Sequence, residues 1–152
     1  MKKESLVFCV DFDGTCVSHE FPEIGADIGS VEVLKRIVRN GHKLVLFTMR
    51  GNLNVPKTAD GEFLTSANNY LEKAVNWFEE NGIELHGINV NPTQHHWTNS
   101  PKAFGNIYID DAAIGCPLTH NSDVSKRPFV DWEEIEYILV KRGILEPELK
   151  FI

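Results

Sequence analysis

Two aspartates spaced two residues apart, Asp11 and Asp13, form the most suggestive chemical pair in the sequence. They lie in the segment Asp-Phe-Asp-Gly-Thr at residues 11–15, directly after the apolar run 6–10. Gly14 permits a sharp turn there, so both carboxylates can face one crevice. A carboxylate can attack a phosphoryl group covalently, and a second carboxyl group can exchange protons with the leaving and attacking oxygens. The segment therefore predicts a nucleophile at Asp11 and a general acid/base at Asp13.

A third acidic position, Asp110, follows a separate apolar run at residues 107–109. Three carboxylates gathered in one crevice repel one another unless a cation neutralises them. Oxygen ligands without neighbouring Cys or His suit Mg²⁺, which takes a few carboxylates together with substrate phosphate oxygens. We therefore expect Mg²⁺ to be bound by Asp11, Asp13 and Asp110.

Hydrophobic patterning predicts an α/β chain in which strands and helices alternate. Apolar, β-prone runs indicate buried strands at residues 6–10, 43–47, 88–90 and 107–109. Helical periodicity indicates helices over 30–40, 66–81 and 131–143, and polar or irregular segments indicate loops at 51–65, 91–100 and 115–127. This alternation is typical of a three-layer α/β/α fold, in which helices cover both faces of a central parallel sheet. Ligands bind beyond the carboxyl ends of such strands, which is where Asp11, Thr48 and Asp110 are placed.

Four motifs, in this order along the chain, resemble those of the haloacid dehalogenase superfamily of phosphohydrolases. They are Val-Asp-Phe-Asp-Gly-Thr at 10–15, Leu-Phe-Thr at 46–48, Lys102, and Tyr-Ile-Asp-Asp at 108–111. The resemblance spans most of the chain and implies a Rossmann-like fold. It also implies Mg²⁺-dependent hydrolysis of a phosphomonoester through an aspartyl-phosphate. An aspartate at position 13 resembles the phosphatase branch of the superfamily, because dehalogenases and phosphonatases lack it.

The resemblance implies a role for each matching residue. It makes Asp11 the nucleophile and Asp13 the general acid/base. It places Mg²⁺ between the carboxylates of Asp11 and Asp110 and the backbone carbonyl of Asp13. The remaining assignments are phosphate binding by Thr48, Met49 and Lys102, and support of the site by Gly14, Thr15 and Asp111.

Other polar residues near the predicted strand ends are candidates for binding the substrate. Lys102 lies unusually close before Asp110, so Lys57 or Lys73 could take the lysine role instead. Arg50 is two residues past Thr48 and could reach a substrate phosphate or carboxylate. Further candidates from the loops are His95 and His96, and the cations Lys126 and Arg127.

Two insertion points hold cap domains in this superfamily, and neither has room for one here. Too few residues separate Thr15 from Ser30, and the residues between Thr48 and Lys102 are used by elements that the core itself requires. The chain therefore resembles the capless class, whose open sites act on large substrates or borrow a neighbouring subunit as a lid. We expect a small phosphorylated metabolite as substrate, with a homo-oligomer as one source of a lid.

The 152 residues fit a single domain, 1–152. The formal net charge of -7 argues against long nucleic acids as partners, because their binding requires a basic surface. No apolar run approaches the length of a membrane span. The cysteines, Cys9, Cys16 and Cys116, are odd in number and unevenly spaced, as expected of free thiols in a reducing compartment. We therefore expect a cytoplasmic protein without membrane partners.

Three alternative functions share these residue types. A phospho-receiver signalling domain also uses aspartates, a threonine and a lysine at strand ends, but its phosphorylated aspartate lies in the middle of the chain. Here the order is aspartate pair, threonine, lysine, aspartate pair, which favours the hydrolase. A polynucleotide-end phosphatase and a non-catalytic phosphate-binding protein remain as further alternatives.

Overall fold

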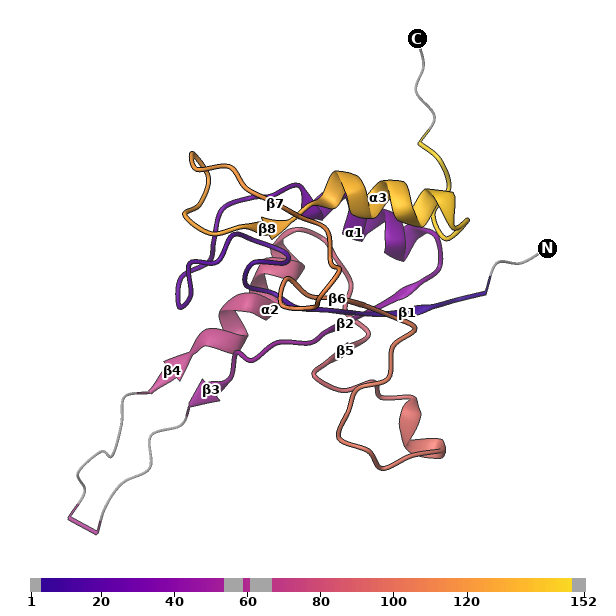
Figure 1. Cartoon of the computed structure of the whole chain (residues 1–152). Coiled ribbons are helices and arrows are strands. Elements are labelled where there is room, and N and C mark those ends of the chain that lie inside the picture. The colour runs from indigo at the N-terminus through magenta and orange to yellow at the C-terminus, as the bar shows by residue number, and fades with distance from the viewer. Residues whose placement is uncertain (1–3, 54–58, 61–66, 149–152) are drawn as a thin grey trace.

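The computed structural model describes residues 4–53, 59–60 and 67–148, and its centre is a four-stranded parallel sheet. The strand order is β5-β2-β1-β6 (Figure 1). The strands are β1 (Val7–Val10), β2 (Lys43–Leu46), β5 (Gly87–Ile88) and β6 (Ile107–Ile109). The predicted α/β class with a central parallel sheet is therefore confirmed.

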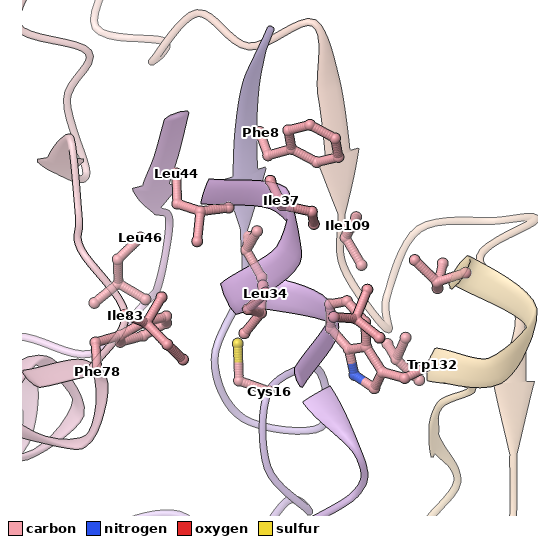
Figure 2. Close-up of a cluster of buried hydrophobic side chains, with 14 of the residues drawn as sticks. Phe8, Cys16, Leu34, Ile37, Leu44, Leu46, Phe78, Ile83, Ile109 and Trp132 are labelled. Atoms are coloured by element: carbon pink, nitrogen blue, oxygen red, sulfur yellow. The ribbon is translucent and has the colours of Figure 1, made fainter. Parts of the chain in front are cut away.

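One face of the sheet carries the main hydrophobic core. Phe8 and Val10 of β1 point to this face and pack with Leu44 and Leu46 of β2. The helices that cover it are α1 (Ser30–Arg39), α2 (Tyr70–Glu80) and α3 (Trp132–Lys141). Figure 2 shows their buried side chains meeting those of the strands: Leu34 and Ile37 from α1, Phe78 from α2 and Trp132 from α3.

The opposite face is covered by the long connection from β5 to β6 instead of by an α-helix. Cys9 and Val45 point to this face and pack against Ala103. The connection contains the short 3-10 helix η1 (Gln94–His96), which lies below the sheet in Figure 1 while α1 and α3 lie above it. We expected helices on both faces. The described α-helices share one face.

The strand order explains this division. The connections β1–α1–β2 and β2–α2–β5 step outward in one direction, whereas the connection from β5 returns across the sheet to β6. Crossovers between parallel strands are right-handed, so reversing the direction of travel moves the connection to the other face. The reversal also creates a switch point between β1 and β6, and such points form ligand-binding crevices at the carboxyl ends of the strands.

Two short antiparallel strand pairs were not predicted, and the first strand of each lies in a segment predicted as a loop. β3 (Asn52–Leu53) pairs antiparallel with β4 (Asn68–Asn69), and β7 (Leu118–Thr119) pairs antiparallel with β8 (Phe129–Val130). The second helix begins at Tyr70, four residues after the predicted start, because Asn68 and Asn69 are drawn into β4; Ser66 itself lies outside the described residues. The segments that follow β1 and β2 contain no cap domain in the described part of the chain. Among these residues, no helix is long and apolar enough to cross a bilayer.

Candidate active site

The candidate site lies at the switch point, where β1 and β6 end side by side. The backbone N–H of Asp11 donates to the carbonyl of Ile109 at 3.0 Å, which extends the β1–β6 pairing by one residue. Asp11 and Asp110 therefore leave the sheet at the same level, as expected from the sequence. The register of two parallel strands thus brings together carboxylates that are far apart in the chain.

Three carboxylates form a compact cluster at this point. Asp11, Asp110 and Asp111 each offer one oxygen within 4.8 Å of the others, and all three residues are half-buried. Gly14 makes room for the third member: its φ is +80°, and a Cβ at this position would collide with the Asp111 carboxylate. The turn after β1 thus requires glycine both for its conformation and for this close approach.

Thr15 ties two of these carboxylates together. Its buried hydroxyl lies 2.9 Å from Oδ2 of Asp11 and 3.3 Å from Oδ1 of Asp111, and it accepts the backbone N–H of Asp111 at 3.0 Å. The backbone carbonyl of Thr15 accepts the indole N–H of Trp132 at 2.7 Å. This network fixes the turn against α3 and supports the role expected of Thr15 in positioning the cluster.

The electrostatics of the cluster favour a cation. Burial raises the pKa of Asp11 to about 7, and the neighbouring charge of Asp110 adds to the shift, while the hydrogen bond from Thr15 opposes it. A cation between the carboxylates would remove this penalty. The donors are all carboxylate oxygens, and among the described residues no His or Cys belongs to the cluster. Such a set could hold a hard divalent cation.

The cluster differs from the predicted metal ligands in one member. It contains Asp111, which was expected to support the site, and it does not contain the Asp13 carboxylate. Both oxygens of Asp13 accept hydrogen bonds from Arg50, at 2.8 Å from Nε and 2.8 Å from Nη2. A contribution of Asp13 through its backbone carbonyl stays a prediction.

Arg50 is turned into the protein and joins three elements. Its side chain is 1% exposed, and its remaining N–H groups donate to the backbone carbonyls of Pro22, Glu23 and Tyr70. The guanidinium also lies 5.1 Å from the ring centroids of both Phe12 and Phe21. All five donors are therefore engaged within the protein, and its predicted contact with substrate stays a prediction.

Thr48 faces the cluster from the end of β2. Its backbone N–H donates to Oδ1 of Asn89 at 2.8 Å, and its hydroxyl oxygen accepts the N–H of Arg50 at 3.1 Å. The hydroxyl hydrogen is therefore free to donate to a ligand. Met49 is fully exposed beside it. Asn89, whose φ is +58°, was not predicted as a site residue, although asparagine is enriched among non-glycine residues with this backbone conformation.

Several of the predicted site residues do not line the cleft. The ammonium group of Lys102 lies 5.3 Å from the ring centroid of Tyr108, which is on the η1 side of the sheet. His95 and His96 are exposed on η1, with their rings 4.1 Å apart. Lys73 lies over the ring of Tyr70 on α2, and Lys57 lies outside the described residues. In the described part of the chain, no lysine lines the acidic cleft.

The cleft around the cluster has a volume of about 410 Å³. Its floor consists of the strand-end residues, and its rim includes His19, Phe21 and Arg127. Arg127 was expected from the sequence as a cation near the site, whereas His19 and Phe21 were not, because neither lies in a motif or follows a strand directly. Only the folded loop after β1 brings them to the cleft.

Comparisons with known proteins agree with this fold. A conserved protein coded by a locus from Bacteroides thetaiotaomicron has a similar structure, with a TM-score of 0.65 and 27% sequence identity. The alignment covers 92% of this chain and 93% of that one. No protein-family model matches the chain. No curated protein matches it either. Fold and site together thus define a parallel α/β protein with an acidic cluster that could hold a metal ion.

Proposed function

We propose that the chain is a Mg²⁺-dependent phosphomonoester hydrolase of the capless haloacid dehalogenase type, acting through an aspartyl-phosphate on Asp11. The observation that carries this proposal is the position of Asp11. It lies at the end of β1, at the switch point of the sheet, within 4.8 Å of two further carboxylates and two residues before Asp13. This arrangement supplies a nucleophile, a cation site and a nearby acid/base group in one cleft.

The donor set fits Mg²⁺, because it consists of clustered carboxylate oxygens on a half-buried floor. Asp11, Asp110 and Asp111 are the residues that would hold the ion. When bound, Mg²⁺ would neutralise charge on the phosphoryl oxygens and keep the carboxylate of Asp11 ionised for attack.

In the first step, an oxygen of Asp11 forms a bond to phosphorus while the bond to the leaving oxygen breaks. Asp13 gives its proton to that oxygen, so the alcohol leaves neutral. In the second step, a water oxygen attacks phosphorus, Asp13 takes a proton from the water, and the bond to Asp11 breaks to release phosphate. Each Asp13 oxygen accepts one N–H from Arg50 and keeps a second lone pair, where this proton can be held.

Thr48 is the residue we assign to the phosphoryl group. Its hydroxyl oxygen already accepts a backbone N–H, so the hydrogen is directed to another acceptor. A phosphoryl oxygen above Asp11 would take this hydrogen bond. A preorganised donor of this kind stabilises the charge on the equatorial oxygens without further rearrangement.

The size of the cleft and the charge of the chain support a small substrate. A volume of about 410 Å³ suits a small organic phosphate. The net charge of -7 disfavours a long polyanion. Faster hydrolysis of a 3'-phosphorylated oligonucleotide than of small phosphomonoesters would contradict this part of the proposal.

The test of the reaction is Asp11→Asn, assayed with 4-nitrophenyl phosphate and Mg²⁺. We expect kcat to fall by at least about 10³-fold, because the nucleophile is removed. Asp123→Asn is the matched control, since Asp123 is an exposed carboxylate that does not line the cleft. Circular dichroism checks that both variants fold. Undiminished hydrolysis by Asp11→Asn would exclude the aspartyl-phosphate mechanism.

A further inference from the structure

Arg127 and His19 form a polar contact on the rim of the cleft, above the acidic floor. Both residues line the cleft, and a guanidinium nitrogen of Arg127 lies 3.2 Å from Nδ1 of His19. They come from distant parts of the chain, since His19 follows β1 and Arg127 lies in the loop between β7 and β8. In Figure 1 these two loops lie on the same side of the molecule.

A separate contact holds the two loops together and thereby places Arg127. The hydroxyl of Ser125 donates to a carboxylate oxygen of Glu20 at 3.1 Å, and the backbone N–H of Arg127 donates to the same hydroxyl at 3.3 Å. Ser125 is itself buried, and its carbonyl interacts with the imidazole of His120 at 3.1 Å. The backbone next to Arg127 is therefore anchored, and its side chain is presented to the cleft.

The contact defines the donors that face a ligand. Arginine has no acceptor, so Nδ1 of His19 accepts from Arg127. In the neutral imidazole the hydrogen is then on Nε2. The remaining N–H groups of the Arg127 guanidinium and the Nε2–H of His19 can therefore donate hydrogen bonds to a ligand at the rim.

Charge balance shows that Arg127 is available to bind an anion. The cleft has two arginines, and Arg50 is matched by the bidentate contact with Asp13. Within the described residues, Arg127 makes no ion pair with a carboxylate, and the hydrogen-bond partner of its side chain is His19. It is therefore a cation on the rim that forms no ion pair with a carboxylate of the floor.

The rim also offers an apolar surface next to this cation. Phe21 is 47% exposed, and its ring is held edge-on against Tyr70 with the centroids 5.1 Å apart. His19 and Phe21 are two residues apart on the same loop. A leaving group bound here would meet an aromatic ring on one side and the Arg127 guanidinium on another.

We propose that the Arg127–His19 pair recognises a second anionic group, a carboxylate or a phosphate, on the leaving-group side of the substrate. The inference rests on the proposed function, because the phosphoryl group must be bound at Asp11 for the leaving group to reach the rim. The substrate class is then a compact phosphomonoester with an additional negative charge. If the substrate carried no anionic group besides its reacting phosphate, Arg127 would have no anion to bind.

Matched aryl phosphates test this selectivity. The wild-type protein with Mg²⁺ is assayed with 3- and 4-carboxyphenyl phosphate and with the corresponding carbamoylphenyl phosphates, which have a similar shape but no second charge. The corresponding phosphonophenyl phosphates distinguish a phosphate-type from a carboxylate-type preference. We expect kcat/KM for at least one anionic compound to exceed that of its neutral partner by about tenfold or more, as for hydrogen bonds to charged groups.

Arg127→Gln should remove the preference, because it should lower kcat/KM for the anionic compounds by a much larger factor than for the carbamoyl compounds. Lys126→Gln is the matched control, because it removes the same charge from the neighbouring position without changing a residue that lines the cleft. Two results would overturn the inference: equal rates for anionic and neutral partners in the wild type, or an equal loss for both in Arg127→Gln. The second result would place Arg127 on the transferred phosphoryl group.

A binding measurement separates this inference from the proposed reaction. Isothermal titration of Asp11→Asn with 4-carboxyphenyl and 4-carbamoylphenyl phosphate, in the presence of Mg²⁺, measures recognition without turnover. Tighter binding of the anionic compound by Asp11→Asn, and loss of this difference in the double variant with Arg127→Gln, would support anion recognition by the Arg127–His19 pair. This result would stand even if wild-type hydrolysis did not depend on Asp11. Equal affinities for the two compounds, together with loss of hydrolysis in Asp11→Asn, would reject anion recognition by the Arg127–His19 pair and would still support the aspartyl-phosphate mechanism.

Discussion

At the scale of single residues, the buried pair of Arg50 and Asp13 has a structural and a chemical role at once. Its five hydrogen bonds connect the loop after β1, the end of β2 and the first turn of α2. Because the arginine is almost fully enclosed, Asp13 has one fixed orientation. Arg50, which was predicted to contact the substrate, thus orients Asp13, the residue assigned to proton transfer.

Replacing this arginine should be costly for stability. We expect Arg50→Gln to lower the free energy of unfolding by about 3–5 kcal/mol, because Asp13, whose side chain is only 12% exposed, loses its charged partner. Arg39→Gln is the control: Arg39 and Glu32 are exposed and 4.0 Å apart, so its loss should cost under about 1 kcal/mol. Urea unfolding measures both. Equal losses would mean that the Arg50–Asp13 pair contributes no more than a surface contact.

The pH dependence of stability should report on Asp11 in the metal-free protein. Burial raises the pKa of Asp11 from 3.8 to about 7, so the folded state holds this proton more tightly than the unfolded state. The resulting stabilisation is fully present below the unfolded pKa and is lost as the pH rises through about 7. In EDTA, the free energy of unfolding should therefore fall more between pH 5 and pH 8 in the wild type than in Asp11→Asn. Parallel pH profiles would contradict this prediction.

At the scale of elements, the tight turn after β1 determines whether the acidic cluster can form. Gly14 adopts a left-handed conformation and lies against the Asp111 carboxylate, so the two strand-end loops are fitted to each other. A side chain at this position would have to displace the neighbouring loop. The geometry of the cluster therefore depends on a residue that has no functional group.

Gly14→Ala should weaken metal binding as well as folding. Left-handed backbone alone costs an alanine about 1–2 kcal/mol, and the added Cβ would also displace Asp111. Gly41→Ala is a matched control, because Gly41 has φ +89° but a Cβ added there would meet no other atom within 4 Å. We expect both variants to lose stability, and Gly14→Ala alone to lose Mg²⁺ affinity in calorimetric titration. Equal metal affinities would show that Asp111 is not a ligand.

The sequence predicted those features that depend on local pattern. Asp131 was expected to begin the last helix, and it caps α3 by accepting the N–H of Glu134 at 3.1 Å. Asp11 and Asp110 were expected to meet because parallel strands end at one edge. The pairing of β7 with β8 and the contact of Arg127 with His19 could not be predicted, because they depend on how two irregular loops pack together. The direction of the Arg50 side chain likewise depends on carbonyls that only the folded loop supplies.

At the scale of the whole molecule, strand order separates the cleft from the opposite face of the sheet. The reversal after β5 places Asp11 and Asp110 on adjacent strands at the switch point and sends the η1 segment across the other face. His95, His96 and Lys102 belong to this segment and do not line the cleft, so their predicted roles stay predictions. One topological feature thus accounts for both the cluster and the course of the η1 segment.

Metal binding should stabilise the entire fold. A ligand that binds only the folded state at 100 times its Kd adds about 2.7 kcal/mol, which corresponds to a rise of roughly 5–10 °C in Tm for a chain of this size. We expect Mg²⁺ to produce such a rise in the wild type and in Asp123→Asn, and none in Asp110→Asn. Differential scanning calorimetry measures the effect. A Tm that is independent of Mg²⁺ in the wild type would exclude the metal site.

The β5–β6 connection also offers positions at which a label or a tether can be attached to the protein. Its exposed positions, such as Asn99, are separate from the residues that line the cleft. A fluorophore or a surface tether attached there would leave the cleft accessible to substrate. Burial raises the pKa values of the native thiols Cys9, Cys16 and Cys116, so they should react slowly with thiol-directed reagents. Immobilisation through this face would therefore give oriented molecules for single-molecule or biosensor measurements.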